Sequence, residues 1–245
     1  MKRLFSLTLI LALMLLTGIS ASADLVSIDG VLHYYDINGR EAEEIGLDVS
    51  FYNNQIDWHA LRNQGFSFVL IRLGGRGWGT GVMYGDRQTQ SYLRGAREAG
   101  LKVGAYFYSA AINPTEAVEE ASQALHVLNG FPLDLPLFID MEQSGSYPNG
   151  RSDRLTPGER ADIAEAFCAA VEAAGYQGGL YAAEGFVRTE MDTGAVACLP
   201  LWLASYTVDN KLPLFIDYYE LWQQTDSARA GGIDGPFDFN IVFPD

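Results

Sequence analysis

FSFVLIRL, at residues 66–73, and LKVGAYFYS, at residues 101–109, are two short and almost continuous apolar runs. Runs of this kind form strands that are buried on both faces. Between them, the residues from Ser91 to Ala99 have the pattern of a helix that stops at Gly100. A strand, a helix and a second strand in this order predict a βαβ unit with parallel strands.

The same alternation continues toward the C-terminus. Asn113-Pro114 opens a helix that ends at Gly130, and the capping box Thr156-Pro157-Gly158-Glu159 opens another that ends at Gly175. Further strands are expected at Leu135 to Met141, Gly179 to Ala183, Leu201 to Tyr206, Tyr219 to Gln224 and Phe237 to Val242. About eight strands in ~200 residues predict an α/β fold, a single closed barrel like the TIM barrel. The alternative is a doubly wound open sheet, but no G-x-G-x-x-G motif follows the first strand to support nucleotide binding.

The first 23 residues have the pattern of a signal peptide. Lys2 and Arg3 precede an apolar run from Leu4 to Leu16, and Ala21-Ser22-Ala23 has the small side chains of a cleavage site. The run is shorter than the ~20 apolar residues of a membrane-spanning helix. We therefore expect residues 1–23 to be removed and the mature chain to be secreted, extracellular or cell-wall associated, with no membrane contact.

Residues 24–44 form a predicted N-terminal lead-in ahead of a domain at residues 45–245. The stretch from Val31 to Asp36 alternates before an Ile37-Asn38-Gly39 turn signal, which predicts a small hairpin. Its Tyr34 and Tyr35 either stack on a sugar or pack the hairpin on the domain surface. The second interpretation is favoured, because aromatic side chains are more often used for packing.

The composition excludes several function classes. Of 245 residues, 31 are Asp or Glu and 16 are Lys or Arg, which gives a formal net charge of -15. Such a charge repels a phosphate backbone, so nucleic acid is not an expected partner. The three histidines and two cysteines have no ligand-like spacing, so we expect no metal and no cofactor. Export permits a disulfide between Cys168 and Cys198 without requiring it, and we expect a monomer.

Asp140 and Glu142 carry the sharpest chemical signal. They end the run LPLFIDME, and the active sites of α/β barrels lie at the carboxyl ends of the strands. Side chains two apart on a strand share one face, so both carboxylates can point into the same site. Two acids in a partly buried site cannot both ionise cheaply, so one holds a proton beside the other's carboxylate. Cleavage of a glycosidic bond needs a proton donor and a carboxylate of this kind. The alternative interpretation is that Asp140 and Glu142 are a solvated pair on the surface.

Three other polar residues end or begin strands of the predicted barrel. They are Asp48 in GLDVS and Asp238 with Asn240 in FDFN. Asp48 lines the site or, alternatively, caps a turn before Phe51. Asp238 and Asn240 line the site or face water from an edge strand.

Aromatic and amide side chains near the same strand ends predict a sugar-binding surface, because a flat ring covers the apolar face of a pyranose. The candidates are Tyr106, Tyr108, Tyr181, Trp202, Tyr206, Trp222, Gln223 and Asn240. Core packing is the alternative for each ring. The glycine-rich stretch from Arg72 to Gly79 lacks the ending of a phosphate-binding loop, and we expect a flexible loop beside the cleft.

Seven motifs in this order resemble glycoside hydrolase family 25, the secreted lysozymes that cut bacterial cell walls. They are GLDVS with IDW, FVLIRLG, GLKVGAYFYS, LFIDME, LWLASY, LWQQT and DFN, and the match runs from Ile45 to Phe243. The resemblance implies an irregular α/β barrel without a cofactor. It also implies hydrolysis of the β-1,4 bond between N-acetylmuramic acid and N-acetylglucosamine in peptidoglycan.

The resemblance also implies a role for each acid. Glu142 resembles the family's general acid and base, Asp140 its partner acid, and Asp48 and Asp238 the other two acids of the cleft. The anomeric configuration would be retained, with either the substrate's 2-acetamido group or Asp140 as the nucleophile. Many relatives have Gln-Gly after the DVS motif, whereas this chain has FYNNQ at residues 51–55, so the local substrate contact is expected to differ.

Two other functions fit the same residues. A non-catalytic cell-wall glycan-binding barrel would keep the aromatic residues but would not need all four acids. A glycosidase acting on chitin-like N-acetyl sugar polymers would use the same acid pair. A peptidase or amidase is disfavoured, because the sequence has neither a metal cluster nor a G-x-S-x-G motif.

Overall fold

A closed barrel forms the body of the protein in the computed structural model, which describes residues 24–36, 38–206 and 220–243. Eight strands form the ring, and they are β3 (Glu44–Val49), β4 (Phe68–Arg76), β6 (Lys102–Ser109), β7 (Leu137–Met141), β8 (Gly178–Ala183), β9 (Leu201–Ala204), β10 (Leu221–Ala228) and β11 (Phe237–Val242). The pairing of β3 with β4 closes the ring. The predicted α/β barrel is thus confirmed. All neighbours are parallel except β11, which is antiparallel to both β10 and β3.

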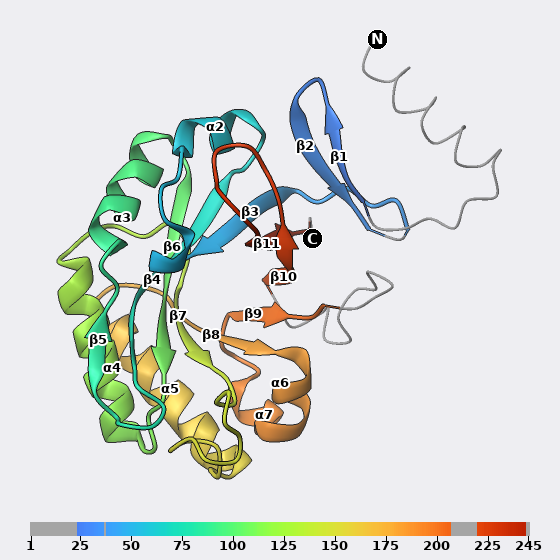
Figure 1. Ribbon diagram of the computed structural model, residues 1–245. Coiled ribbons are helices and arrows are strands. Elements are labelled where there is room, and N and C mark those ends of the chain that lie inside the picture. The colour runs from blue at the N-terminus through green and yellow to red at the C-terminus, as the bar shows by residue number, and fades with distance from the viewer. Residues whose placement is uncertain (1–23, 37, 207–219, 244–245) are drawn as a thin grey trace.

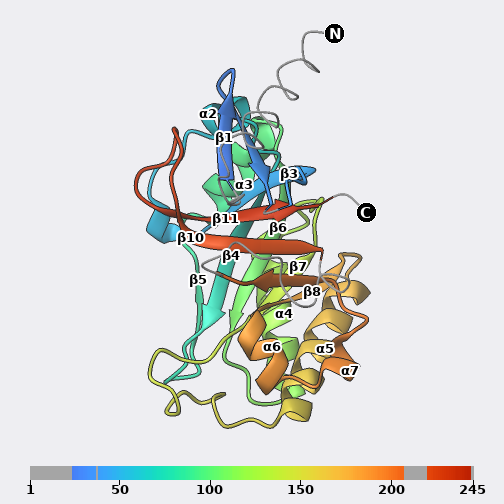
Figure 2. The same cartoon turned by 90° about the vertical axis from the view of Figure 1, so that its right-hand side faces the viewer.

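Helices cover one side of the barrel (Figures 1 and 2). α3 (Thr89–Glu98), α4 (Pro114–Leu128) and α5 (Pro157–Ala173) pack on β4, β6, β7 and β8. The predicted caps are present: Asn113 accepts the amide of Glu116 at 3.0 Å, and Thr156 and Glu159 form a capping box. The shorter helices are η1 (Phe51–Asn53), α2 (Trp58–Asn63), α6 (Glu184–Glu190) and α7 (Thr193–Val196).

The N-terminal lead-in is a hairpin that packs on β10 and β11. It consists of β1 (Asp24–Ile28) and β2 (Val31–Tyr35), and its tight turn is Asp29-Gly30, both with positive φ. The predicted turn at residues 37–39 is therefore not the hairpin turn, although the chain reverses there as well, with an isolated bridge between Tyr35 and Glu41. Ile37 itself lies outside the described residues. Tyr34 is buried against Trp222 and Phe239, so packing is its role in this fold.

The glycine-rich stretch from Arg72 to Gly79 was predicted as a flexible loop, and this was wrong for residues 72–76, which are a strand, whereas residues 77–79 lie in the turn that follows. β4 continues to Arg76 and pairs with the additional strand β5 (Met83–Gly85). The two strands approach so closely that a Cβ on Gly74 would lie 2.2 Å from the carbonyl oxygen of Tyr84. Arg76 is buried and binds Glu120 at 2.8 Å and Glu119 at 3.0 Å, both on α4. The glycines therefore serve close packing of β-strands.

Alternating strand side chains divide the core into two layers. The layer inside the barrel contains Phe68, Leu70, Tyr106, Phe138, Tyr181, Trp202, Ala204 and Leu221. The second and larger layer lies between the strands and the elements that cover them. A side chain on the inner face of a strand thus reaches the barrel interior or its mouth, and its immediate neighbours do not.

Three expectations concern other parts of the chain. The predicted signal peptide at residues 1–23 lies outside the described residues. Cys168 is buried and Cys198 is exposed, and both are free thiols in this structure. Within residues 24–36, 38–206 and 220–243, no helix is both long and apolar enough to cross a membrane.

Candidate active site

The barrel brings the four predicted acids to one mouth. Asp140 lies near the end of β7 with Glu142 just beyond it, and Asp48 lies near the end of β3. Asp238 lies at the start of β11, and because this strand is antiparallel its first residues lie at the same mouth. Asp238 is directly opposite Asp48 in the pairing of β11 with β3. The edge-strand and turn-cap interpretations are therefore excluded.

Asp140 has an inward position in the barrel wall. It is 5% exposed and lies between Tyr108 of β6 and Tyr181 of β8 in the register of the parallel strands. Burial raises its pKa well above the ordinary range, the nearby charges of Glu142 and Asp48 add to this rise, and Arg72 opposes it. Its buried Oδ1 has no hydrogen-bond partner among the described residues.

Glu142 is exposed to solvent at the mouth but is still surrounded by protein groups. Partial burial raises the pKa of its carboxyl, and the charge of Asp238 raises it further. The nearby hydroxyl of Tyr181 opposes this rise, because it favours the ionised carboxylate. Glu142 thus combines access to a ligand with a pKa shifted toward the protonated form, as a general acid requires.

Asp48 and Asp238 form a second acid pair. Burial raises the pKa of Asp48 well above its ordinary range, and the charge of Asp238 adds to the effect. Burial and the charge of Asp226 raise the pKa of Asp238 to about 6. Two adjacent carboxyls, one buried and one partly buried, hold one proton between them more readily than two negative charges.

A buried polar network supports Asp48. Its Oδ2 accepts hydrogen bonds from Nε2 of Gln223 at 2.7 Å and from Nδ2 of Asn240 at 2.9 Å. Asn240 in turn accepts the indole N–H of Trp202 at 2.7 Å. Gln223 accepts the hydroxyls of Tyr181 at 2.8 Å and Tyr206 at 2.5 Å. Gln223 and Asn240 therefore contact protein groups rather than facing open solvent.

Comparison with known proteins places this acid-lined barrel in a family. The family model for glycosyl hydrolases family 25 matches residues 47–233. The chain belongs to glycosyl hydrolase family 25. This match covers most of the chain and includes all of the barrel strands except part of β3 and all of β11.

Relatives and solved structures agree with the family. The autolytic lysozyme of Clostridium acetobutylicum is 28% identical over 196 residues, which are 80% of this chain and 54% of the relative. Lysozyme M1 of Streptomyces globisporus is 26% identical over 203 residues, which are 80% of this chain and 66% of the relative. The modular autolysin LytC from Streptococcus pneumoniae has a similar fold, with a TM-score of 0.75 at 21% identity, covering 90% of this chain and 52% of LytC. The chain thus spans about half the length of the clostridial lysozyme.

The predicted aromatic residues of this family 25 barrel lie in three different places. Tyr106, Tyr181 and Trp202 belong to the interior layer, so they form the floor beneath the acids. Tyr108 is half-buried beside Asp140, and Tyr206 is 50% exposed at the mouth. These last two have the surface that a sugar ring needs.

Trp222 does not face the mouth, and its prediction as a sugar contact was wrong. It is 0% exposed and packs against Tyr34 and Phe243, while its indole N–H donates to the carbonyl oxygen of Ser205. Gln223, the next residue along β10, faces the interior instead. The alternation of strand side chains therefore puts only one of this adjacent pair at the site.

The sequence analysis did not predict the residues of β4, β5 and the FYNNQ stretch that form one wall of the barrel mouth. Arg72 of β4 binds Asp86 at 3.1 Å, and its guanidinium lies 5.0 Å from the ring of Phe51 and 5.3 Å from that of Tyr52. Arg72 lowers the pKa of Asp140. The charge of Asp140 in turn helps to raise the pKa of Tyr84 of β5. Arg72 is the polar residue in the apolar run FVLIRL, and this was the available signal. The Phe51-Tyr52 pair occupies the FYNNQ stretch, with Tyr52 72% exposed.

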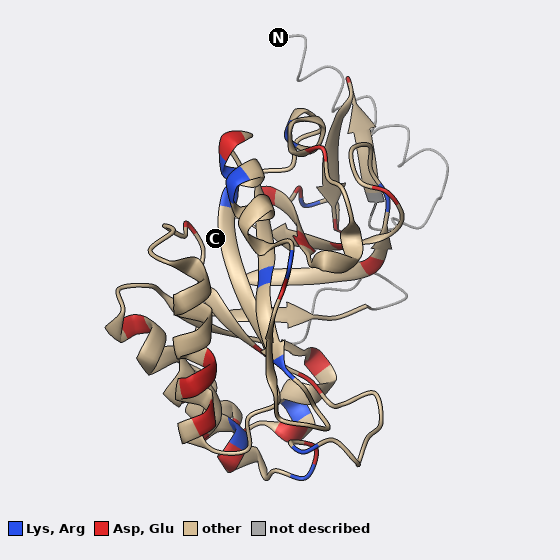
Figure 3. Ribbon diagram, turned by 60° about the vertical axis from the view of Figure 1, so that its left-hand side comes forward, with Lys and Arg blue, Asp and Glu red and all other residues tan. Residues whose placement is uncertain are grey.

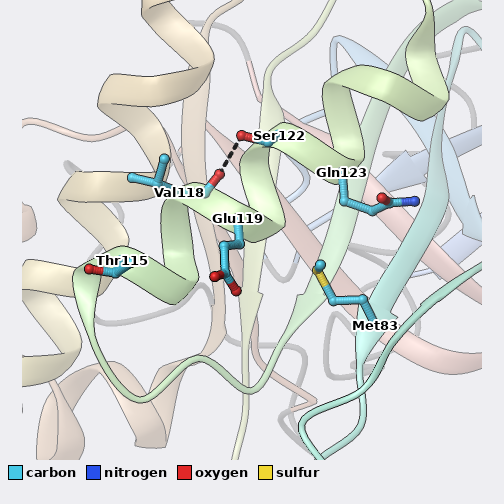
Figure 4. A pocket seen from close by; sticks show the side chains of 6 residues that line it. All are labelled: Met83, Thr115, Val118, Glu119, Ser122 and Gln123. Atoms are coloured by element: carbon cyan, nitrogen blue, oxygen red, sulfur yellow. Dashed lines mark hydrogen bonds between the residues drawn. The ribbon is translucent and has the colours of Figure 1, made fainter.

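A shallow groove lies between β5 and α4, lined by Met83, Thr115, Val118, Glu119, Ser122 and Gln123 (Figure 4). None of the four acids lines it. Acidic residues recur along the covering helices (Figure 3), but no group of three or more His, Cys, Asp or Glu suited to a metal occurs in the described part of the chain.

Proposed function

We propose that this chain is a lysozyme-type glycoside hydrolase that cleaves the β-1,4 bond between N-acetylmuramic acid and N-acetylglucosamine in bacterial peptidoglycan. The observation that carries the proposal is the pair Asp140 and Glu142 at the barrel mouth, both with raised pKa values. A proton donor beside a second acid is the arrangement that glycosidic bond cleavage needs. Family membership and two relatives that are lysozymes support the substrate.

The inward position of Asp140 next to Glu142 supports a substrate-assisted reaction with retention of configuration. In this mechanism the acetamido N–H of the muramic acid donates to Asp140, which favours the ionised form of Asp140 and leaves the proton of the acid pair on Glu142. Glu142 gives that proton to the glycosidic oxygen as the C1–O bond breaks. The acetamido carbonyl oxygen then forms a bond to C1 and closes a cyclic intermediate.

The second half of the reaction restores the proton of Glu142. Glu142, now a carboxylate, removes a proton from a water molecule whose oxygen attacks C1. The bond from C1 to the acetamido oxygen breaks, so the sugar leaves with its original anomeric configuration. Asp140 stays ionised throughout and stabilises the positive charge of the cyclic intermediate.

Binding and location are part of the same proposal. Tyr108 and Tyr206, with their accessible ring surface beside the acids, would contact the sugar chain. The wall formed by Tyr52, Arg72 and Tyr84 would contact a neighbouring sugar or its substituent. With residues 1–23 as a signal peptide, the protein would act outside the cell or in the cell wall, as a monomer and without a cofactor.

Fragment analysis tests the proposal. Purified protein is incubated with peptidoglycan sacculi and, separately, with chitin oligomers, and the products are identified by mass spectrometry. The proposal expects fragments with muramic acid at the reducing end, and NMR of the first product formed should show the β-anomer. Release from chitin alone would identify a chitin-type glycosidase, and binding to sacculi without fragments would identify a glycan-binding barrel.

A further inference from the structure

The exposed aromatic side chains of the protein gather at the mouth of the barrel. In the described part of the chain, five aromatic residues are more than a third exposed, and each follows the carboxyl end of a parallel strand: Tyr52 after β3, Trp78 and Tyr84 after β4, Tyr147 after β7 and Tyr206 after β9. None of these five lies on α3, α4 or α5. Exposed apolar side chains that gather on one face in this way mark an interaction site.

Trp78 differs from the other three tryptophans of the chain. It is 42% exposed, whereas Trp58, Trp202 and Trp222 are buried. It lies in the turn that joins β4 to β5 (Figure 1). Trp78 therefore keeps a large apolar ring in contact with water, where a ligand can cover it.

Hydrogen bonds fix the backbone of the turn that carries Trp78. The N–H of Gly77 donates to the carbonyl oxygen of Val82 at 2.9 Å and closes the turn. The carbonyl oxygen of Trp78 itself accepts the backbone N–H of Arg151, in the loop after β7, at 2.9 Å. The guanidinium of Arg151 is held in turn by both carboxylate oxygens of Glu116, at 2.6 and 2.8 Å. A ring on a backbone fixed in this way has less freedom to lose when a ligand binds.

A row of residues across the strands connects the β4–β5 hairpin with the acids. Tyr84 of β5 is opposite Gly75 of β4, and Gly75 is opposite Tyr108 of β6. Tyr108 in turn is opposite Asp140 of β7. Residues opposite each other share one face of a sheet, so the whole row lies on the inner face. A Cβ on Gly75 would lie 2.6 Å from the Tyr84 hydroxyl oxygen and 2.8 Å from the Tyr108 Cβ, so the two tyrosines approach each other above this glycine.

We propose that Trp78 is the platform of a distal subsite, which binds one pyranose ring of a glycan strand at a distance from the cleaved bond. Gly75 is two strands, or about 10 Å, from Asp140 along the row, and Trp78 follows three residues later. A glycan strand must therefore extend beyond the sugars at the acids before it covers the indole. The ligand is a neutral ring face rather than an acidic peptide, because the chain has a net charge of -15 and four acids at its mouth. The inference rests on the proposed function, and it names a polymeric strand rather than a short fragment as the substrate.

Quenching of tryptophan fluorescence by acrylamide tests the platform, because Trp78 is the tryptophan that the quencher reaches. The measurement uses Glu142→Gln, which slows cleavage, and Trp78→Phe in the same background gives the residual quenching of the three buried tryptophans. The ligand is a glycan strand freed of its peptides by an amidase. We expect strands to lower the quenching toward that of Trp78→Phe, and the disaccharide of N-acetylglucosamine and N-acetylmuramic acid to leave it unchanged. Quenching that strands do not lower, or that the disaccharide lowers equally, would contradict the proposal.

Kinetics on substrates of two lengths give a second readout. Trp78→Ala removes the ring, so the ratio of kcat/KM for long strands to kcat/KM for a tetrasaccharide should fall about 5-fold or more, through KM. Trp78→Phe, which keeps a flat ring, should restore part of this ratio. Val82→Ala, at a residue of the same turn that is 67% exposed, is the matched control. An unchanged ratio in folded Trp78→Ala would overturn the proposal.

The two experiments separate this inference from the lysozyme reaction, because the fluorescence measurement needs no turnover. Strands that protect Trp78 in a protein that releases no fragments from sacculi would disprove the reaction alone. Release of fragments by the wild type, with the quenching and the ratio both unaffected, would disprove the distal subsite alone.

Discussion

Asp48 and Asp238 lie directly opposite each other in the antiparallel pairing of β3 with β11, and their carboxyls interact at the mouth of the barrel. The reversed direction of β11 is what makes this possible, because it brings the start of a strand to the ends of its neighbours. Two amide donors already bind Oδ2 of Asp48. Burial and mutual repulsion favour one shared proton on the pair, although these two donors oppose it.

Asp238→Asn tests the shared proton through stability. The pKa of Asp238 is about 6 in the fold, against 3.8 ordinarily. A raised pKa means that stability is fully present below the ordinary value and is lost as pH rises from about 4 to 6. Removing the acid should thus raise the free energy of unfolding relative to the wild type by about 2 kcal/mol more at pH 7 than at pH 4. Urea unfolding at both pH values measures this, with exposed Asp162→Asn as control, and an equal difference at both would refute it.

Tyr34→Ala tests whether the N-terminal hairpin is held by packing. Tyr34 is buried among Trp222, Phe239 and Phe243, so its loss should destabilise the protein by about 3 kcal/mol. Because the ring is remote from the acids, KM should stay unchanged. Thermal unfolding and steady-state kinetics check both parts, and a raised KM with unchanged stability would instead support a sugar contact.

Arg76→Met tests the buried ion pair that holds β4 against α4. Glu120 is fully buried and would lose its cationic partner at 2.8 Å, which should cost about 3 to 5 kcal/mol. The double variant Arg76→Met with Glu120→Leu removes the stranded charge as well. It should be more stable than the single variant in urea unfolding, and a double variant that is less stable would contradict this account.

Asp140→Asn tests the role of the Asp140 carboxylate. The amide keeps the shape of the side chain but cannot hold the negative charge that the cyclic intermediate needs, so kcat should fall by about 10²-fold or more. Asp162→Asn, an exposed aspartate on α5, should leave kcat unchanged. Comparison of kcat at equal folded concentration gives the answer, and a wild-type kcat in Asp140→Asn would remove Asp140 from the mechanism.

The sequence predicted the barrel because each βα unit carries its own local signals. Apolar runs and caps such as Asn113-Pro114 are read within a few residues, and the spacing of two between Asp140 and Glu142 defines a common face. The same rule applied to Gln223 would have excluded Trp222, its neighbour on the opposite face. Period-two alternation was therefore the strongest signal in the chain.

Long-range contacts account for what the sequence did not predict. The glycines after Arg72 looked like a loop because nothing local shows that β5 packs against them. The antiparallel direction of β11 depends on its pairing with β3, nearly two hundred residues away. The network of Trp202, Asn240 and Gln223 joins three strands, so its members looked like separate sugar contacts. Arg72 alone had a local signal, a charge within an apolar strand.

The most direct test of the central claim compares the wild type with Glu142→Gln on purified sacculi, with mass spectrometry of the soluble products. Glu98→Gln, an exposed glutamate on α3, is the matched control. We expect the wild type and the control to release fragments ending in reducing muramic acid, and folded Glu142→Gln to release them at least about 10²-fold more slowly. Equal release by Glu142→Gln would contradict the account.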